Sequence, residues 1–221
     1  MSSVAKSARQ SAAVLLSLSA LLAASAIGAT SASAAPANAD DAQAPAGWER
    51  VDTELMNELL VEDGAAPLSA SSATVEELPW AIESMNTGLF VAAELNYAQP
   101  NTGLLRARSD WFNGGWEQYA INFDEVSETI TITNKANGLN VATERNFTGA
   151  SNGLLRARSE GVGSWERYVL YYHEVNDTFA FQSVVNGLFV ATERNYTGQL
   201  QNALRARSDW INGSWEQFYL W

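Results

Sequence analysis

The C-terminal part of the sequence contains one unit repeated three times. The motif Gly-Leu-x-Val-Ala-[Ala/Thr]-Glu begins at Gly88, Gly138 and Gly187, so its copies lie 50 and 49 residues apart. The motifs Arg-Ala-Arg and Trp-Glu follow in every copy with the same period. A period of this length is typical of architectures in which each repeat is one small structural unit. Residues 80–221 are therefore expected to fold as three equivalent parts.

Each unit has the pattern of short β-strands separated by polar turns. Leu105 and Ala107 alternate with Arg106 and Arg108, and residues 129–133 form a β-branched run. Clusters of Asn, Gly, Ser and Asp lie between such segments. Alternation and β-branched runs bounded by turn residues indicate strands. We expect four strands per unit and about twelve in all.

The third unit ends before its fourth strand, and residues 80–84 supply the missing one. Ile82 precedes Gly88 by six residues, just as Ile132 precedes Gly138. We expect this displaced strand to pair beside the C-terminus and close the ring, which removes an exposed sheet edge. Twelve strands, three equivalent units and closed ends predict an all-β fold, a β-trefoil with pseudo-threefold symmetry. A propeller is the alternative, but it normally has at least four blades.

Residues 1–34 have the pattern of a secretory signal peptide. Lys6 and Arg9 precede an apolar stretch over residues 12–28, and small residues follow at 32–34 and again at 37–39. This order is typical of exported proteins, with cleavage after residue 34 or after residue 39. A membrane helix is the alternative, but the apolar run is short for a bilayer span. The Ala- and Ser-rich signal resembles those of high-GC Gram-positive bacteria, so we expect a secreted, extracellular bacterial protein.

Residues 40–79 carry ten acidic side chains against Arg50 alone. Leu55, Met56, Leu59 and Leu60 fall at helical spacing, which indicates a short amphipathic helix between Ala-, Pro- and Ser-rich flanks. One interpretation is an acidic linker exposed to solvent. The other is a docking segment or pro-segment that becomes ordered on a partner protein.

Composition excludes several classes of function. The chain has no Cys and one His, so disulfides, cysteine-held metals and His-rich metal sites are excluded, and no metal or cofactor is expected. The formal net charge is −12. Nucleic acids and anionic membranes are therefore not expected partners, because their binding depends on Lys and Arg.

The repeated motifs resemble a known family. The pattern N-G-[LN]-x-V-A-[AT]-E, then L-x-A-R, then G-[GS]-W-E-[QR]-[YF], is similar to fascin-like β-trefoil domains, including bacterial ones that bind carbohydrate for secreted polysaccharide-degrading enzymes. The resemblance covers all three units and implies a binding domain, for glucan-type sugars in secreted bacterial proteins or for actin in animal cells. The ricin-type lectin trefoil fits less well, because its Q-x-W motif is absent here.

The Trp-Glu motif offers a repeated aromatic platform. Strict alternation from Tyr119, which faces the core, places Trp116 on the opposite face of the strand. Carbohydrate sites combine a flat aromatic ring with a few polar side chains that fix hydroxyl groups. The alternative is that these tryptophans are partly buried supports whose neighbouring Glu pairs with a repeat Arg. Beside them, each unit also repeats an Asn followed by an aromatic residue.

Trp111 and Trp210 lie in polar, Gly-rich loops, where a large aromatic side chain is better explained by binding than by packing. The second unit has a shorter loop without Trp, so we expect units one and three to be the stronger sites. The candidate carbohydrate-binding residues are Asn96, Tyr97, Trp111, Trp116, Glu117, Asn146, Phe147, Trp165, Glu166, Asn195, Tyr196, Trp210, Trp215 and Glu216.

Catalysis is not expected. The obvious Glu residues recur threefold, whereas a catalytic centre places two carboxylates in different environments. The repeat arginines are interpreted as surface-paired, and His173 as a strand residue. Two functions remain: a secreted carbohydrate-binding trefoil that binds a cell-wall or other polysaccharide multivalently, and an interaction subunit that docks onto another secreted protein through residues 40–79 or the trefoil surface.

Overall fold

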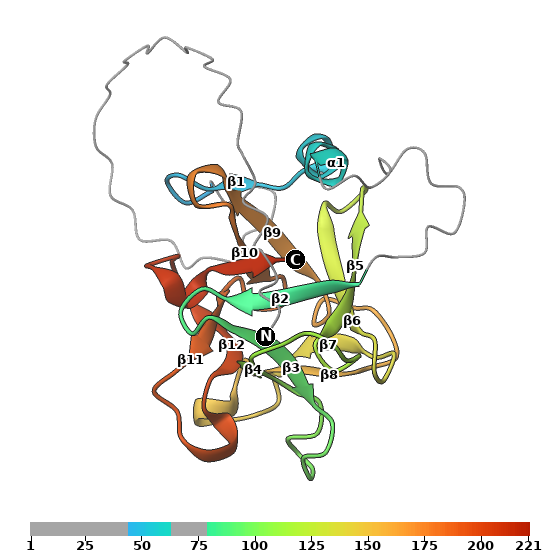
Figure 1. Ribbon diagram of the computed structural model, residues 1–221, viewed down its shortest axis with the longest axis vertical. Helices are drawn as coiled ribbons and strands as arrows, with labels where there is room; N and C mark the ends of the chain where they lie inside the picture. Colours follow the sequence, from blue (N-terminus) through green and yellow to red (C-terminus); the bar gives the residue numbers. More distant parts are fainter. Residues whose placement is uncertain (1–43, 63–78) are drawn as a thin grey trace, which may run out of the picture. The chain divides into compact units, whose positions relative to one another are not determined.

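A computed structural model describes residues 44–62 and 79–221 of the chain (Figure 1). The predicted signal peptide, its cleavage site, and residues 40–43 and 63–78 of the acidic segment lie outside the described residues. The strands are β1 (Glu49–Arg50), β2 (Trp80–Ser84), β3 (Leu89–Glu94), β4 (Leu104–Ser109), β5 (Gln118–Asp124), β6 (Thr129–Asn134), β7 (Asn140–Thr143), β8 (Leu155–Ser159), β9 (Tyr168–His173), β10 (Thr178–Ser183), β11 (Phe189–Glu193), β12 (Ala203–Ser208) and β13 (Phe218–Leu220). One α-helix, α1 (Thr53–Glu62), and four short 3-10 turns, η3 (Gly149–Ser151), η4 (Glu174–Asn176), η5 (Gly198–Leu200) and η6 (Ser214–Glu216), complete the described elements.

Six strands form a closed antiparallel ring. The pairing runs from β2 to β5, β6, β9, β10 and β13, and β13 pairs back onto β2. The displaced first strand therefore lies beside the C-terminal strand, with Ile82 opposite Leu220. This confirms the predicted ring closure, which leaves the barrel without a free edge.

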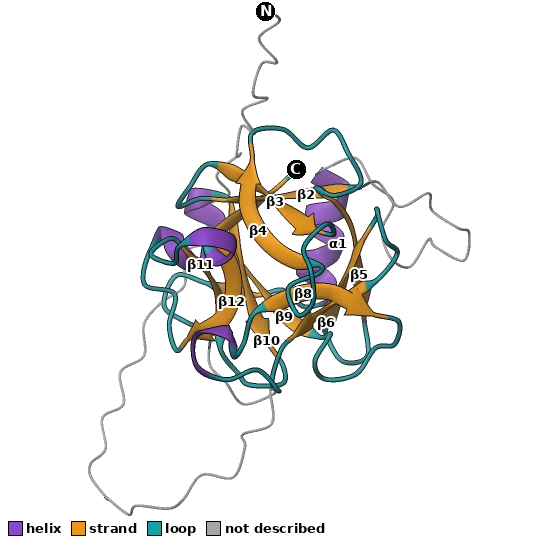
Figure 2. Cartoon of the chain, turned by 90° about the horizontal axis from the view of Figure 1, so that it is seen from below, coloured by secondary structure: helices purple, strands orange, loops and turns teal. Residues whose placement is uncertain are grey.

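The other six strands of residues 80–221 form three hairpins, β3–β4, β7–β8 and β11–β12. β4 pairs with both β8 and β12, and Leu154 bridges to Arg205. In Figure 2, β4, β8 and β12 surround the pseudo-threefold axis. Leu104, Leu154 and Ala203 form a buried apolar cluster there. A six-stranded barrel with three such hairpins is the predicted β-trefoil, and β1 is a thirteenth strand.

Glycine is required where one hairpin crosses its neighbour. Gly103 and Gly153 have φ angles of +82° and +88°, in the left-handed region. A Cβ atom at Gly103 would lie 2.5 Å from the carbonyl oxygen of Ala157, and one at Gly153 would lie 2.6 Å from that of Ala206. Only a residue without a side chain fits this approach. Gly103 and Gly153 thus mark two contacts between units, and Asn202 takes the equivalent position in unit three with a φ angle of +58°.

Residues 44–62 are part of the folded structure and not a solvent-exposed linker, which their acidic composition indicates. β1 pairs with β9, and the Val51 amide donates to the Leu170 carbonyl over 2.9 Å. Val51 is fully buried and Met56 is 8% exposed, both within the barrel core. The apolar face of α1 accounts for the difference. Burial of Met56 and its neighbours against the barrel stabilises the segment there, while the acidic face of the helix stays in solvent.

Helix α1 begins directly after Asp52, which caps its first turn. The Asp52 carboxylate accepts a hydrogen bond of 2.9 Å from the Leu55 amide, which makes Asp52 the N-cap. Leu55, Leu59 and Leu60 also pack against the barrel core. In Figure 1, α1 lies at the end of the barrel away from β3, β4 and β8. The segment therefore covers the barrel end opposite the hairpins.

We expect Met56→Ala to lower the free energy of unfolding by about 2 to 4 kcal/mol, because it leaves a cavity between α1 and the barrel core. Chemical denaturation of the variant and of the wild type measures this difference. Val61→Ala is the matched control, since Val61 lies on the exposed face of the same helix. Equal stability of the two variants would contradict the packing of α1.

Candidate functional site

The three Trp-Glu motifs lie in turns that precede strands. β5 begins at Gln118, so Trp116 is outside the strand and strict alternation does not determine its direction. The Trp116 carbonyl accepts a hydrogen bond of 2.9 Å from Ala93, and the Trp165 carbonyl accepts one of 2.8 Å from Thr143. In each case the turn is therefore fixed to the hairpin of its own unit.

An arginine covers one face of each of these tryptophans. The guanidinium carbons of Arg108, Arg158 and Arg207 lie 5.9, 5.7 and 5.8 Å from the ring centres of Trp116, Trp165 and Trp215. All three tryptophans are half-buried. Such contacts are attractive because the cation meets the negative face of the ring. The tryptophans of the Trp-Glu motifs therefore stabilise the fold, and their rings remain partly accessible to solvent.

The same arginines are held by a buried carboxylate. In unit three, Glu193 is paired with Arg205 at 3.4 Å and with Arg207 at 2.9 Å. Glu94 and Glu144 hold the Arg pairs of units one and two in the same way. The interpretation of the repeat arginines as surface pairs is wrong for these side chains, because each partner Glu is buried at the end of a hairpin strand.

The first arginine of each pair also reaches into the preceding unit. Arg106 donates to the Gln201 carbonyl over 2.8 Å. Arg156 and Arg205 donate in the same way to the carbonyl groups of Thr102 and Asn152, over 2.9 and 2.6 Å. The three units are thus joined in a cycle by equivalent hydrogen bonds.

The carboxylates of the Trp-Glu motif face their own loops. Glu117, Glu166 and Glu216 are buried. Glu166 accepts a hydrogen bond of 2.8 Å from the Gly163 amide, and Glu216 accepts one of 3.2 Å from Asn212. These side chains fix the loop that precedes the tryptophan. A ligand would meet them only at the edge of that loop.

The predicted Asn–aromatic loops lie at the other end of the hairpin strands. Tyr97 and Phe147 pack onto the buried cluster of Leu104, Leu154 and Ala203 at the pseudo-threefold axis. The Tyr97 hydroxyl accepts a hydrogen bond from Arg106, and Arg156 lies 5.7 Å from the Phe147 ring centre. Tyr196 likewise accepts from Arg205 over 2.8 Å. The preceding residues Asn96, Asn146 and Asn195 are exposed.

The structure therefore divides the predicted residues into two groups. Tyr97 precedes β4 and Trp111 follows it, and a strand of this length separates its ends by about 17 Å. One sugar ring cannot contact both groups. The Asn–aromatic loops, such as the one at Tyr97, and the loops that carry Trp111 and Trp210 are therefore separate surfaces.

The two loop tryptophans are exposed, as the sequence predicts. Trp111 is 62% exposed and Trp210 is 65% exposed. Their backbone turns are fixed, because the hydroxyls of Ser109 and Ser208 each donate to the carbonyl of the loop tryptophan over 2.7 Å. In unit two, Ser159 makes the equivalent bond to the Gly161 carbonyl at 3.0 Å. Unit two keeps the turn without an aromatic side chain.

In unit three the tryptophan loop borders a pocket of about 310 Å³. Its walls are Arg207, Ser208, Asn212, Trp215 and Glu216. The predicted residues Trp215 and Glu216 thus meet the Trp210 loop, whose turn is held by Ser208. This pocket and Trp210 form the candidate site.

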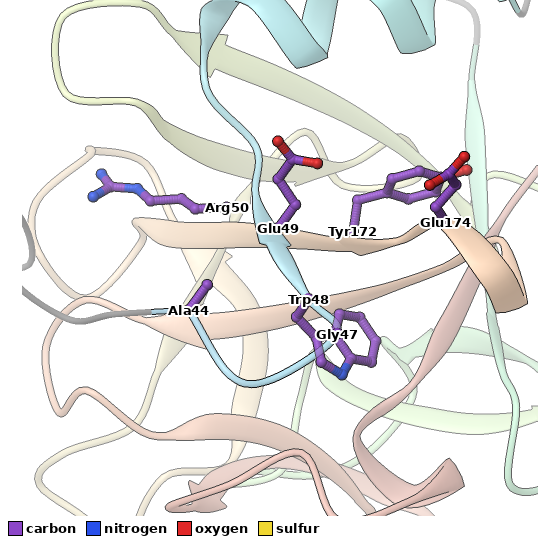
Figure 3. A pocket seen from close by; sticks show the side chains of 7 residues that line it. All are labelled: Ala44, Gly47, Trp48, Glu49, Arg50, Tyr172 and Glu174. Atoms are coloured by element: carbon purple, nitrogen blue, oxygen red, sulfur yellow. The ribbon is translucent and has the colours of Figure 1, made fainter. Parts of the chain in front are cut away.

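A larger hollow of about 400 Å³ lies beside β1 (Figure 3). Arg50 and Ala44 point to one side of the strand there, whereas Tyr172 and Glu174 lie on the other. Its side chains do not converge on one point, which a ligand site requires. We therefore place the candidate site in unit three.

Arg207, Ser208 and Asn212 were missed among the candidate residues of the sequence. The signal that could have found them is the strict recurrence of Arg-Ala-Arg-Ser, since a surface pair does not require the same spacing in three units. Within residues 44–62 and 79–221, no group of three or more acidic or His side chains is placed to hold a metal ion. No helix of these residues is long and apolar enough to cross a membrane.

No protein-family model matches the sequence, and no curated protein matches it. The structure is similar to the designed threefold symmetric protein ThreeFoil, with a TM-score of 0.52, 15% identity, and coverage of 64% of this chain and 96% of that one. It is also similar to an endo-β-galactosidase from Clostridium perfringens that releases GlcNAcα1-4Gal, with a TM-score of 0.50 and 13% identity over 70% of this chain and 34% of that one. A proteinase inhibitor from Coprinopsis cinerea has a TM-score of 0.50 and 14% identity, with coverage of 66% and 98%. At these identities the comparisons establish the fold, a β-trefoil.

We expect Glu144→Gln to lower the free energy of unfolding by about 3 kcal/mol, because it removes the charge that two arginines share in a buried site. Denaturation in urea measures the loss. Glu160→Gln is the matched control, since Glu160 is exposed in the same unit. A loss no larger than that of the control would show that the buried carboxylate does not stabilise the hairpin.

Glu216 gives the stability a pH dependence. Burial raises the pKa of its carboxyl above the ordinary value of 4.5, and the hydrogen bond from the Asn212 amide opposes this only in part. The folded state therefore holds the proton more tightly than the unfolded chain. Its stabilising contribution is fully present below pH 4.5 and is lost as the pH rises through the folded-state pKa.

The variant Glu216→Gln cannot titrate at this position. We expect the free energy of unfolding of the wild type, relative to this variant, to fall between pH 4.5 and neutral pH. Urea denaturation at several pH values measures the difference. A difference that stays constant or increases with pH would contradict the raised pKa.

Proposed function

We propose that the protein is a secreted, non-catalytic carbohydrate-binding trefoil. The observation that carries the proposal is the unit-three site, where the loop that carries the exposed Trp210 also contributes Asn212 to a pocket lined by Arg207 and Trp215. A flat aromatic surface beside a few convergent polar groups suits a pyranose ring, whose apolar face stacks while its hydroxyls are bound.

The polymer we propose is a glucan-type polysaccharide, as the resemblance to bacterial fascin-like modules implies. Trp111 offers a second exposed ring on the equivalent loop of unit one. Two weak sites on one molecule bind a polymer more tightly than either alone, because the second contact is effectively intramolecular. Unit two, whose loop has no aromatic side chain, contributes less.

The roles of the repeated carboxylates support the proposal of binding without cleavage. Glu117, Glu166 and Glu216 are buried in equivalent positions, and the latter two bind loop amides. A glycosidase needs two carboxyl groups with different protonation at a set distance from one sugar bond. Three buried carboxylates in equivalent positions, two of them bound to loop amides, favour a structural role.

The similar structures are compatible with binding and do not specify the ligand. The Clostridium perfringens protein acts on a saccharide, whereas the Coprinopsis cinerea protein inhibits a proteinase. This chain covers only a third of the former. The fold therefore presents loops for unrelated partners, and the loop tryptophans are what favour a sugar here.

The alternative is an interaction subunit that binds another secreted protein. Residues 40–79 were its expected docking segment, but within the described part of that segment the apolar face of α1 already packs on the barrel through Leu55, Met56 and Leu59. A protein partner would have to use the exposed acidic face of the helix or the trefoil surface. This alternative is tested together with the first.

Sedimentation with insoluble polysaccharides tests the proposal. We expect the protein to be retained on at least one of β-1,3-glucan, β-1,6-glucan, chitin, cellulose and peptidoglycan. Trp111→Ala/Trp210→Ala should reduce retention at least about tenfold, because both stacking surfaces are lost. Val126→Ala/Val175→Ala, which removes two exposed apolar side chains from hairpin turns, should bind as the wild type.

Absence of retention on every polymer would overturn the carbohydrate proposal. Equal retention of the wild type and the tryptophan variant would overturn the assignment of the site. In the first case, affinity capture with the wild type and with a charge-reversed α1 would identify a protein partner of the acidic face.

A further inference from the structure

The two exposed tryptophan loops are supported differently. In unit one, Phe112 follows Trp111, is 42% exposed, and packs on Phe90 with ring centres 4.8 Å apart. In unit three, Ile211 follows Trp210 and packs against a buried cluster on the outer side of the sheet. That cluster consists of Val169, Tyr171, Ala180 and Phe189. The side chain next to Trp210 is thus held by the body of the protein.

The N-terminal segment packs on the same cluster. Ala44 and Trp48 lie against it, together with Ile211. Trp48 also meets the His173 ring edge to face, with ring centres 5.1 Å apart. The N-terminal segment, through Ala44 and Trp48, and the Trp210 loop, through Ile211, therefore pack on the same cluster.

The segment is fixed beyond Trp48. β1 pairs Glu49 with Tyr172, and Val51 is buried in the barrel core. Trp48 is therefore placed by a strand pair and a core anchor, so that its ring forms a fixed wall. This wall packs on the same buried cluster as Ile211, and a closely packed cluster transmits a shift on one side to the side chain on the other.

We propose that Trp48 is a positioning residue for the Trp210 loop, which makes unit three the preorganised and tighter of the two sugar sites. The inference rests on the proposed function. A loop that is already fixed loses less conformational entropy on binding, so its affinity is higher for the same contacts. Residues 44–50, which the sequence marks as part of a linker, thereby control one site of the trefoil and not the other.

The path from Trp48 to the ligand is short. Trp48 and Ile211 pack on one cluster, and Ile211 stands between Trp210, the exposed ring, and Asn212, a wall of the pocket. A shift of Ile211 therefore moves both contacts at once. Phe112 in unit one packs on Phe90 and takes no part in this cluster.

The first test is hydrogen–deuterium exchange, which does not depend on a ligand. We expect Trp48→Ala to raise the exchange rates of residues 209–213 by about fivefold or more and to leave residues 110–114 unchanged, because local opening of a loop becomes easier when its support is removed. Trp48→Phe keeps an aromatic wall and should restore the wild-type rates. Faster exchange in both loops, or in neither, would overturn the proposal.

The second test measures affinity one site at a time, with retention on the polysaccharide that the wild type binds. In a Trp111→Ala background only unit three keeps its ring, and Trp48→Ala should weaken binding about tenfold. In a Trp210→Ala background only unit one keeps its ring, and Trp48→Ala should have no effect. Equal weakening in both backgrounds would mean that Trp48 acts on overall stability alone.

The two proposals fail separately. If no polysaccharide is bound, the proposed function is wrong while the exchange result still decides whether Trp48 holds the loop. If binding is found but is insensitive to Trp48→Ala in the Trp111→Ala background, the positioning role is wrong and the proposed function stands. Thermal unfolding of each variant checks that it is folded, and Trp48→Leu, which removes the aromatic wall but keeps an apolar side chain, replaces Trp48→Ala if that variant does not fold.

Discussion

The carboxylate that ends the first hairpin strand of each unit binds two guanidinium groups at once. Glu193 holds Arg205, which reaches the preceding unit, and Arg207, which lies over Trp215. A buried charge of this kind is tolerated only where its partners satisfy it, so the three side chains fix one another. Removal of the carboxylate would leave the neighbouring unit, the tryptophan and the loop without their common support.

This arrangement explains why the repeat is so strict in some places and so variable in others. The Glu that ends the first motif and Arg-Ala-Arg recur because they form the ion-pair network, and the Trp of Trp-Glu recurs because an arginine of that network lies over its ring. The loop between Arg-Ala-Arg and Trp-Glu lies outside that network and is free to change, which is where unit two loses its aromatic side chain. The common motifs hold the fold, and the three units differ in the exposed loop between them.

The repeat predicted the fold because period, strand pattern and the displaced strand at Ile82 are all visible without coordinates. The direction of Trp116 was not predictable by alternation, because β5 begins two residues after it and the turn has its own geometry. The docking of α1 was missed for a different reason. A helical pattern of Leu55, Met56 and Leu59 shows that a face will be buried, and it does not say against what. The packing of Trp48 and Ile211 on one buried cluster depends on contacts distant in sequence, which no local pattern records.

The closed ring has a consequence for the order in which the protein folds. Trp221 donates to Glu83 across 138 residues of chain, and the barrel is complete only when β13 lies on β2. Contacts so distant in sequence form late, because the intervening chain must lose its freedom first. The cycle of arginine bonds adds to this, since unit one depends on the carbonyl of Gln201 in unit three. A nascent chain that lacks residues 201–221 therefore has neither a closed barrel nor the Arg106 bond of its first repeat, and both can form only after this part of the third unit has been synthesised.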